Sequence, residues 1–237
     1  MQRKMWMSLC AAALLVLGAV LGMAGRASAA EAPPRMRNAG YIWRIDADDV
    51  RGLPRNFRTM EDEFHAPYKK DMDDSYVPTR EGLERLHASG SGEFSASGLQ
   101  SLLEALAEKT QMPICIVDLR EESHGFFDGI AVSWYGEHDW GNVGLTQEEA
   151  LADEAERIHG AAGQMTAVAH LGGEKNPLDE HEIFVEEAQT EKELVEAAGL
   201  RYKRIAATDH IWPSPAAVDE FVQFYKSMPE DVWLHFH

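Results

Sequence analysis

Asp209 and His210 are the first residues whose type and position suggest chemistry. They stand in RIAATDHIWPSP (204–215), where a predicted strand ends and a loop begins. Ligands of α/β sheets bind beyond the carboxyl ends of the strands, and a loop aspartic acid there can protonate a leaving group if its pKa is raised. An aspartate at such a position can equally cap a turn. The spacing leaves both interpretations of Asp209 open, and the turn cap is the simpler one.

A second group of polar residues follows another apolar run. Asp118, Arg120, Glu122 and His124 stand close together in IVDLREESHGFFDG (116–129). Carboxylates beside an imidazole can form a metal site or an acid–base site, but this spacing matches no strong metal template. We therefore favour a structural network of ion pairs for this group.

A third group lies between aromatic residues. Glu137, His138 and Asp139 are flanked by tryptophan and tyrosine in WYGEHDWGN (134–142). A carboxylate beside aromatic rings can contact a polyhydroxylated or ring-shaped ligand. The simpler alternative is a hairpin tip whose aromatic rings face the core.

Two single cations and the last two histidines are further candidates. Arg58, in NFRT (56–59), could clamp a phosphate with two hydrogen bonds or form a surface salt bridge. Lys175 is a similar cation in GGEKNP, where a solvated loop position is the simpler interpretation. His235 and His237 alternate without a carboxylate or cysteine beside them, which makes a zinc site there a weak hypothesis.

Helical and extended segments alternate along the chain and would position these residues. Apolar spacing and N-terminal capping residues predict helices at 80–87, 97–110, 146–163, 190–199 and 214–228. Apolar runs predict strands at 41–45, 113–119, 129–136, 165–171, 182–188, 201–208 and 232–237. Ser97 is the expected N-cap of the helix at 97–110. This alternation favours an α/β sheet protein.

Net charge and the amino terminus narrow the class of protein. The 237 residues carry a formal net charge of −18, and such a field repels polyanions, so no nucleic acid partner is expected. Residues 1–30 have early basic residues, a short apolar run and then small residues, as bacterial secretory signals do. We expect a secreted or periplasmic protein with a mobile segment at 31–40 and no stable membrane association after signal cleavage; an uncleaved anchor is the alternative. Cys115 is the only cysteine after the signal, which excludes an internal disulfide there.

Three long phrases, taken together, resemble a known family. They are IVDLREESHGFFDGIAVSWYGEHDWGN, EAAGLRYKRIAATDHIWPSP and DVWLHFH. In this order and at these distances they closely resemble the cysteine phytases, which are the protein-tyrosine-phosphatase-like inositol polyphosphate phosphatases of bacteria. The likeness runs from about Arg58 to His237.

The resemblance implies a fold and a domain division. The implied fold is an α/β phosphatase domain, with a central sheet flanked by helices, and a small partial β-barrel domain. Residues 41–60 and 141–189 would form the small domain, and residues 61–140 and 190–237 an incomplete phosphatase domain. In the family, the strand that resembles VWLHFH is followed directly by the loop His-Cys-x5-Arg. His237 matches that histidine, so we expect a chain truncated one residue before the nucleophile, with the C-terminal part of the phosphatase domain missing.

The resemblance also implies an activity and the residues that carry it. An enzyme of this family would remove phosphates from myo-inositol hexakisphosphate (phytate), a small-molecule substrate, through a cysteinyl-phosphate intermediate and without a metal or other cofactor. Asp209 matches the general acid, and His237 precedes the nucleophile. The residues that would contact the substrate are Arg58, Asp139, His210 and, in a loop that diverges from the family, Lys175.

Two other functions stay open at this point. One is a phosphatase for phosphotyrosine or for lower inositol phosphates. The other is a non-catalytic protein that binds inositol phosphates and lacks the cysteine or the arginine. The 237 residues by themselves are expected to be inactive, because the missing loop would supply both the nucleophile and the anion-binding amides.

Overall fold

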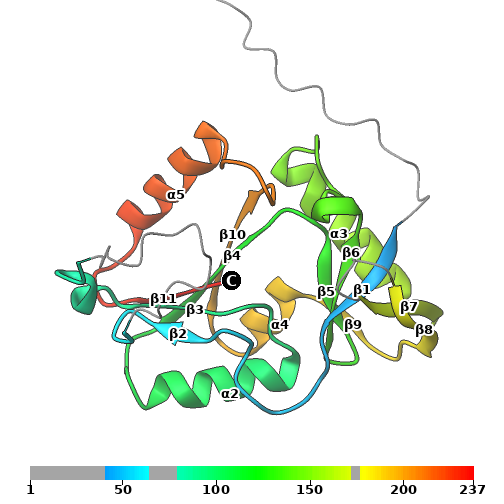
Figure 1. Cartoon of the computed structure of the whole chain (residues 1–237), viewed down its shortest axis with the longest axis horizontal. Coiled ribbons are helices and arrows are strands. Elements are labelled where there is room, and N and C mark those ends of the chain that lie inside the picture. The colour runs from blue at the N-terminus through cyan, green and yellow to red at the C-terminus, as the bar shows by residue number, and fades with distance from the viewer. Residues whose placement is uncertain (1–40, 64–78, 172–176) are drawn as a thin grey trace, which may run out of the picture. The chain divides into compact units, whose positions relative to one another are not determined.

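Two β-sheets organise the part of the chain that the structure describes. The structure is a computed structural model, and it describes residues 41–63, 79–171 and 177–237. One sheet has five strands in the order β10-β4-β11-β3-β2, and the other has six in the order β8-β7-β1-β6-β5-β9 (Figure 1). Helices flank the sheets, so the predicted α/β class is confirmed.

The five-stranded sheet has β11, the strand that ends at Phe236, at its centre. Its members are β2 (Arg58–Thr59), β3 (Ala88–Gly90), β4 (Ile114–Arg120), β10 (Arg201–Ala207) and β11 (Trp233–Phe236). β11 pairs in parallel with β3 and β4, and β10 pairs in parallel with β4. The neighbours Trp233 and Leu234, which point to opposite faces, are both buried, as the bulky alternation predicted. Parallel pairing places the carboxyl ends of β4, β10 and β11 at one edge of the sheet.

Helices cover both faces of this sheet. α2 (Ala96–Ala107) and α4 (Glu191–Ala197) pack on one face, around the fully buried Leu102. α5 (Pro215–Ser227) packs on the other face, over a cluster that includes Leu234. Successive side chains of a strand point to opposite faces, so β11 contributes to both cores.

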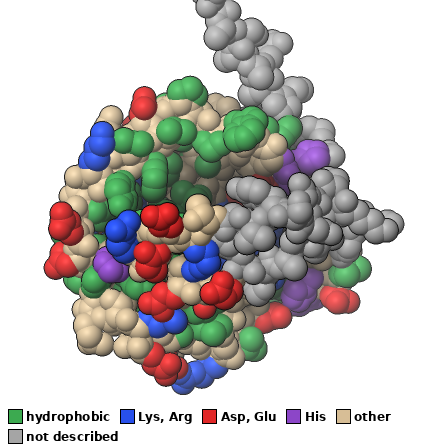
Figure 2. Space-filling model, turned by 60° about the vertical axis from the view of Figure 1, so that its left-hand side comes forward, with side chains coloured by type: hydrophobic (Ala, Val, Ile, Leu, Met, Phe, Trp, Pro, Cys, Tyr) green, Lys and Arg blue, Asp and Glu red, His purple; other side chains and the backbone are tan. Residues whose placement is uncertain are grey.

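The outer face of α5 keeps hydrophobic side chains exposed. Val218, Val222 and Tyr225 of this helix are exposed, as are Ile211 and Trp212 in the loop before it. Figure 2 brings this side of the molecule forward and shows hydrophobic side chains beside acidic and basic ones. Trp212 is 91% exposed, so the loop between β10 and α5 is open to solvent.

The N-terminal caps follow the sequence except at α2. Ser95 caps this helix, and its hydroxyl accepts a hydrogen bond from the Gly98 amide at 3.0 Å. The prediction of Ser97 as the cap was wrong, because Ser97 already lies in the first turn and its amide donates to the Asp49 carboxylate at 2.7 Å. Ser214 caps α5, as predicted.

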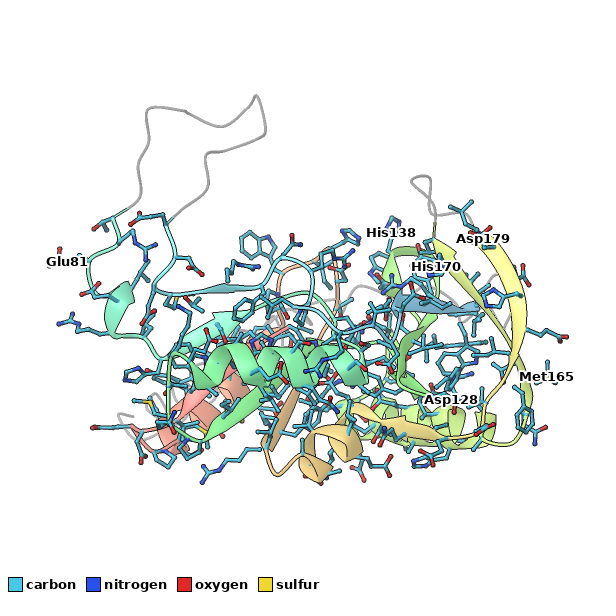
Figure 3. The ribbon with its side chains drawn as sticks, turned by 90° about the horizontal axis from the view of Figure 1, so that it is seen from below. Glu81, Asp128, His138, Met165, His170 and Asp179 are labelled. Atoms are coloured by element: carbon cyan, nitrogen blue, oxygen red, sulfur yellow. The ribbon has the colours of Figure 1, made fainter. Side chains whose placement is uncertain are left out.

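The six-stranded sheet collects strands from distant parts of the chain. Its members are β1 (Ile42–Ala47), β5 (His124–Phe127), β6 (Ile130–Tyr135), β7 (Met165–Leu171), β8 (Pro177–Phe184) and β9 (Ala188–Thr190). β1 pairs antiparallel with β6 and parallel with β7. β7 and β8 form an antiparallel edge, with Met165 and Asp179 towards opposite ends of it (Figure 3). α3 (Gln147–Ala161) packs on β5 and β9 and buries Ile158 in the core of this sheet.

Some elements differ from the predictions. The sequence does not predict β2, β3, β5 or β9. These strands are short, and β3 and β9 pair with strands far along the chain. The helix predicted at 80–87 is reduced to the 3-10 turn η1 (Leu83–Arg85). The strand predicted at 182–188 instead spans Pro177–Phe184, where it pairs with β7.

The strands are not divided between the sheets at the predicted domain boundaries. β5 and β6 belong to the range 61–140, which was predicted as phosphatase domain, yet they pair with β9 and β1 in the six-stranded sheet. Arg58–Thr59 belongs to the predicted small domain, yet it pairs in the five-stranded sheet. The partial barrel and the division into domains stay predictions.

The amino-terminal predictions concern residues that the structure leaves undescribed. The predicted signal at 1–30 and the predicted mobile segment at 31–40 both lie outside the described residues. Among the helices that are described, none combines the length and the apolar character that a membrane crossing requires.

Candidate active site

A cavity of about 400 Å³ opens at the carboxyl edge of the five-stranded sheet. The end of β4 and the loop after β10 form one part of its wall, and β1 and η2 (Glu137–Asp139), which follows β6, form another. The sequence-predicted site residues that the structure brings together in this wall are Asp139, Asp209, His210 and His237.

Asp209 lies in the loop between β10 and α5. Its carboxylate accepts a hydrogen bond from the His210 amide at 2.9 Å, and the His210 ring lies 3.3 Å from the second oxygen. The Trp140 indole donates to the Asp209 carbonyl at 3.0 Å, which ties this loop to the segment after β6. The Asp209 side chain is 55% exposed. The carboxyl group therefore makes a local turn contact and is also within reach of a ligand in the cavity.

Asp139 is held by an arginine from β1. Both of its carboxylate oxygens accept hydrogen bonds from Nη1 of Arg44, at 2.9 and 3.1 Å. His138 and Asp139 both adopt a left-handed backbone with φ of 61°, which is uncommon for residues other than glycine. Burial raises the pKa of Asp139, while Arg44 opposes this change. Any ligand contact of Asp139 is therefore shared with Arg44.

Trp134, which lies on β6 and precedes Asp139, packs against other aromatic rings. Trp134 stacks on Tyr41 with ring centres 5.9 Å apart and meets Trp43 edge-on at 5.1 Å. The guanidinium of Arg157 lies over the Trp134 ring at 4.8 Å. The ring of Trp134 thus packs on the protein, as the simpler interpretation predicts, while Asp139 lines the cavity and its contact with a ligand stays a prediction.

Arg58, one of the two predicted single cations, does not line this cavity. Arg58 is exposed, donates to the Asn56 carbonyl at 2.8 Å and lines a second cavity beside η1. It pairs with Gly90, which in turn pairs with Phe236, so Arg58 lies level with the end of β11 and two strands away from it. Lys175 lies outside the described residues. Substrate contacts by these two residues stay predictions.

Three arginines of the cavity wall were not assigned to ligand binding from the sequence. They are Arg44, Arg55 and Arg120. Arg44 and Arg120 are engaged by carboxylates, whereas the exposed Arg55 has no ion pair within the described residues. A signal for Arg44 was available, because a charge inside the apolar strand YIWRI must find a polar partner when the strand is buried.

The polar group around Asp118 is a buried network of ion pairs, as predicted. Asp118 lies 3.0 Å from Arg204 and 3.1 Å from His124, and it accepts a hydrogen bond from the Tyr202 hydroxyl at 2.5 Å. Arg204 also pairs with Glu154 of α3 at 2.7 Å. Burial raises the pKa of Asp118, but Arg204 and His124 outweigh burial and hold the pKa well below its usual range. Because the partners come from β4, β5, β10 and α3, the network joins the two sheets.

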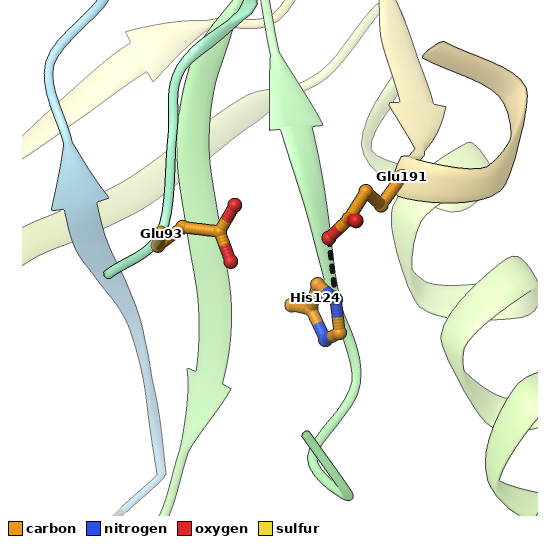
Figure 4. A group of neighbouring side chains, drawn as sticks. All are labelled: Glu93, His124 and Glu191. Carbon is orange, nitrogen blue, oxygen red and sulfur yellow. Dashed lines mark hydrogen bonds and ion pairs between the residues drawn. The ribbon is translucent and has the colours of Figure 1, made fainter. Parts of the chain in front are cut away.

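Glu191 links this network to His237. One oxygen of Glu191 accepts a hydrogen bond from His124 at 3.1 Å (Figure 4), and the other accepts one from His237 at 2.7 Å. Glu93 faces His237 from the other side at 3.5 Å. Burial lowers the pKa of His237, and the two carboxylates outweigh burial and raise the pKa to about 10. His237 is therefore a buried cation at neutral pH.

The same group has donor atoms of the kind that bind metals. Ligand atoms of Glu93, His124 and Glu191 lie within 4.8 Å of one another. Glu93 already pairs with Arg120, and Glu191 with both histidines. These residues are thus satisfied as ion pairs.

His235 differs from His237 in its charge state. Burial and the charge of His237 lower the pKa of His235 to about 3. The Trp233 indole donates to the Ser89 hydroxyl at 2.8 Å, and that hydroxyl lies 2.9 Å from Nδ1 of His235. Ser91 lies 3.1 Å from Nε2 and donates to a backbone carbonyl, so it can accept from the ring. His235 is a neutral structural residue, and the two histidines do not form a pair.

Cys115 is buried in β4 and is expected to resist alkylation. Its side chain belongs to the core beneath α5, and burial raises the pKa of its thiol to about 11. Only the thiolate reacts readily. Peptide mapping after iodoacetamide treatment in mildly alkaline buffer should find Cys115 unmodified in the folded protein and modified in concentrated urea. Equal modification in both states would contradict this prediction.

Comparison with known proteins adds a family assignment to this geometry. The model of the protein-tyrosine-phosphatase-like phytase family, described as "Inositol hexakisphosphate", matches residues 117–237. The effector protein hopD2 of Pseudomonas syringae pv. tomato is 34% identical over 201 residues, which are 82% of this chain and 41% of that protein. The chain thus spans less than half the length of this curated relative.

Solved structures of similar proteins agree with this fold. The tandemly repeated protein tyrosine phosphatase like phytase from Mitsuokella multacida matches with a TM-score of 0.77 and 49% identity, over 84% of this chain and 34% of that chain. The PTP-like myo-inositol phosphatase from the same organism, in complex with myo-inositol-(1,3,4,5)-tetrakisphosphate, matches with a TM-score of 0.75 and 48% identity, over the same shares. A PTP-like phytase from Bdellovibrio bacteriovorus matches with a TM-score of 0.60 and 27% identity, over 84% of this chain and 62% of that chain. The chain belongs to the family of protein-tyrosine-phosphatase-like phytases.

Proposed function

We propose that the full-length protein removes phosphates from myo-inositol hexakisphosphate through a cysteinyl-phosphate intermediate. The observation that carries the proposal is the cavity at the carboxyl edge of β4, β10 and β11, where Asp209, His210 and His237 meet. Membership of the phytase family supports the reaction class. The wall of the cavity supports a polar ligand, because it contains three arginines and five carboxylates.

The nucleophile of this reaction is proposed to be a cysteine that directly follows His237. Cys115 is unsuitable because it is buried with a raised pKa, and a nucleophilic cysteine must be an accessible thiolate. In the family pattern, the residues after the nucleophile form a loop whose amides and arginine bind the phosphoryl oxygens. The 237-residue chain would then be inactive without that loop.

The proposed chemistry needs one proton donor besides the thiolate. The thiolate attacks phosphorus, the bond from phosphorus to the inositol oxygen breaks, and Asp209 gives its proton to that oxygen. Water then attacks the phosphocysteine, its proton passes to Asp209, and the thiolate leaves. His210 would contact the substrate beside Asp209, Asp139 would contact the inositol or its substituents, and Arg58 and Lys175 would contact peripheral phosphates.

The test of this proposal is phosphate release by the full-length protein, with the 237-residue chain as the comparison. Inositol hexakisphosphate and a phosphotyrosine peptide should be assayed side by side. We expect turnover of the inositol phosphate by the full-length protein and none by the shorter chain. A clear preference for the peptide, or a gene without Cys-x5-Arg after the codon for His237, would refute the proposal.

Lower inositol phosphates are a second candidate substrate. A similar structure contains bound myo-inositol-(1,3,4,5)-tetrakisphosphate. Assays with tetrakis- and hexakisphosphates at equal concentration would rank the two substrates. Binding of either without release of phosphate would instead support a non-catalytic inositol phosphate binding protein.

The proposed site of action is outside the bacterial cytoplasm. The composition of residues 1–30 supports a secreted or periplasmic protein. Fractionation of cells that express the full-length protein, with N-terminal sequencing of the exported form, tests this. An intact N-terminus in the membrane fraction would favour the uncleaved anchor.

A further inference from the structure

Two buried histidines share one carboxylate between the sheets. His124 stands at the start of β5 in the six-stranded sheet, and His237 directly follows β11 in the five-stranded sheet. Glu191, the first residue of α4, lies between them and offers one oxygen to each ring, at 3.1 and 2.7 Å. The side chains of all three are at most 1% exposed. Among the described residues, Glu191 is the carboxylate that lies within 3.1 Å of both rings.

The position of Glu191 is determined from several sides. His124 donates from its other ring nitrogen to the Glu122 carbonyl at 2.9 Å, and it also contacts Asp118 at 3.1 Å. Asp118 is held in turn by Arg204. The contacts of Glu191 with the two histidines are therefore supported by residues of the strands β4, β5 and β10. Rotation of the Glu191 carboxylate would break a hydrogen bond to a buried imidazole.

His237 has little freedom once Glu191 is in place. Its Nε2 donates to Glu191, its Nδ1 faces Glu93 at 3.5 Å, and its ring lies 5.0 Å from the ring of Phe94. The Nδ1 contact is too long to count as a hydrogen bond. The short bond to Glu191 is thus the contact that sets the orientation of the ring.

We propose that Glu191 is the positioning residue of His237, and that its short hydrogen bond to Nε2 fixes the orientation of the imidazole at the edge of the active-site cavity. The contact between Glu191 and His237 does not depend on the proposed function, but its consequence for catalysis rests on that function. A fixed positive charge beside a cysteine favours its thiolate, so the nucleophile proposed to follow His237 would ionise more easily while Glu191 is present.

A purely structural role for Glu191 is the competing explanation. An acidic residue in the first turn of a helix is favourable by itself, and Glu193 in the same turn completes the capping box with Thr190. Helix stabilisation, however, does not require burial or contact with two histidines. The two explanations differ in what Glu191→Gln does to His237, because only the positioning role predicts a change there.

Several titratable or charged groups besides Glu191 lie around His237, and one of them, His235, is neutral. They come from the segment before α2, from β4, from β5 and from β11 itself. They are Glu93, Asp118, Arg120, His124 and His235. Glu93 is itself paired with Arg120, so its attraction for His237 is partly offset, and Glu191 supplies the larger share.

The test is an NMR titration of histidine in the full-length protein. Glu191→Gln, which keeps the shape and removes the charge, is expected to lower the pKa of His237 from about 10 by about 1 to 3. Glu196→Gln on the exposed side of the same helix removes the same charge and should leave His237 unchanged. An unchanged pKa in Glu191→Gln, or an equal change in both variants, would overturn the proposal.

A second measurement needs no variant. At a pH of about 8.5, which is above the usual pKa of histidine, both ring nitrogens of His237 should carry protons, visible in their nitrogen chemical shifts. A neutral His237 ring at that pH would also overturn the proposal, even if Glu191→Gln failed to fold.

A kinetic measurement separates this inference from the proposed function. If the nucleophile follows His237, the pH at which it reacts half-maximally with iodoacetate should rise in Glu191→Gln and be restored in Glu191→Asp, which keeps the charge. Absence of phosphatase activity in the unaltered protein would refute the proposed function, while the titration of His237 would still decide the role of Glu191. A pH profile that Glu191→Gln leaves unmoved would overturn the catalytic consequence.

Discussion

Replacing Asp209 by asparagine is expected to lower the turnover of the full-length protein on inositol hexakisphosphate by about 10² to 10⁴. An alkoxide is a poor leaving group, so loss of the proton donor raises the barrier for breaking the phosphorus–oxygen bond. Asparagine keeps the size of the side chain and can still accept from the His210 amide, which Asp209 contacts at 2.9 Å. Steady-state phosphate release gives kcat and KM for both proteins, and we expect the loss in kcat.

The leaving group distinguishes a general acid from a structural residue. On p-nitrophenyl phosphate, whose phenolate leaves without a proton, the loss in Asp209→Asn should be much smaller. Asp219→Asn, an exposed change in α5, is the matched control and should leave kcat near that of the unaltered protein. An equal loss on both substrates would show that Asp209 acts as a turn cap.

Arg204→Met should destabilise the protein by about 3–5 kcal/mol, because it leaves buried carboxylates without their cationic partner. Arg204 is 3% exposed and pairs with Asp118 at 3.0 Å and Glu154 at 2.7 Å. It also donates to the carbonyls of Glu121 and Glu122, at 3.3 and 2.9 Å. Equilibrium unfolding in urea, followed by tryptophan fluorescence, measures the free energy of unfolding of both proteins.

Two further variants test the reason for this loss. Arg201→Met is an exposed change on the same strand and should alter stability by no more than about 0.5 kcal/mol. Adding Asp118→Asn to Arg204→Met should recover part of the lost stability, because it removes one of the two carboxylates that lost their partner. Strictly additive losses in the double variant would show that the two side chains are not coupled.

The capping boxes show where sequence predicts structure well. Thr146 and Thr190 each precede a glutamate by three residues, and both form the reciprocal pair of hydrogen bonds at the starts of α3 and α4. All atoms of such a motif lie within four residues, so distant parts of the chain hardly affect it. Ser97 shows the limit of the same reasoning, because serines stand at both 95 and 97, and it is Ser95 whose extended backbone and hydroxyl cap α2.

The candidate site was predictable in part. Asp209, His210, Asp139 and His237 follow recognisable elements, and the structure brings all four to one cavity. Arg44 was missed, because its partner Asp139 lies 95 residues away along the chain.

By itself, the sequence determined most of the helices and longer strands, the likeness to the phytase family and the presence of a polar group around Asp118. The elements and the polar group follow from the short-range spacing of residues. The likeness to the family follows from long sequence phrases that can be recognised without knowledge of tertiary contacts. Only the tertiary structure decided the charge state and role of each buried group. His235 is neutral between serines, while His237, two residues on, is a cation because Glu191 and Glu93 face it. Such differences in charge state arise from desolvation and from partners that folding brings together. Neither can be predicted from the spacing of the residues in the sequence.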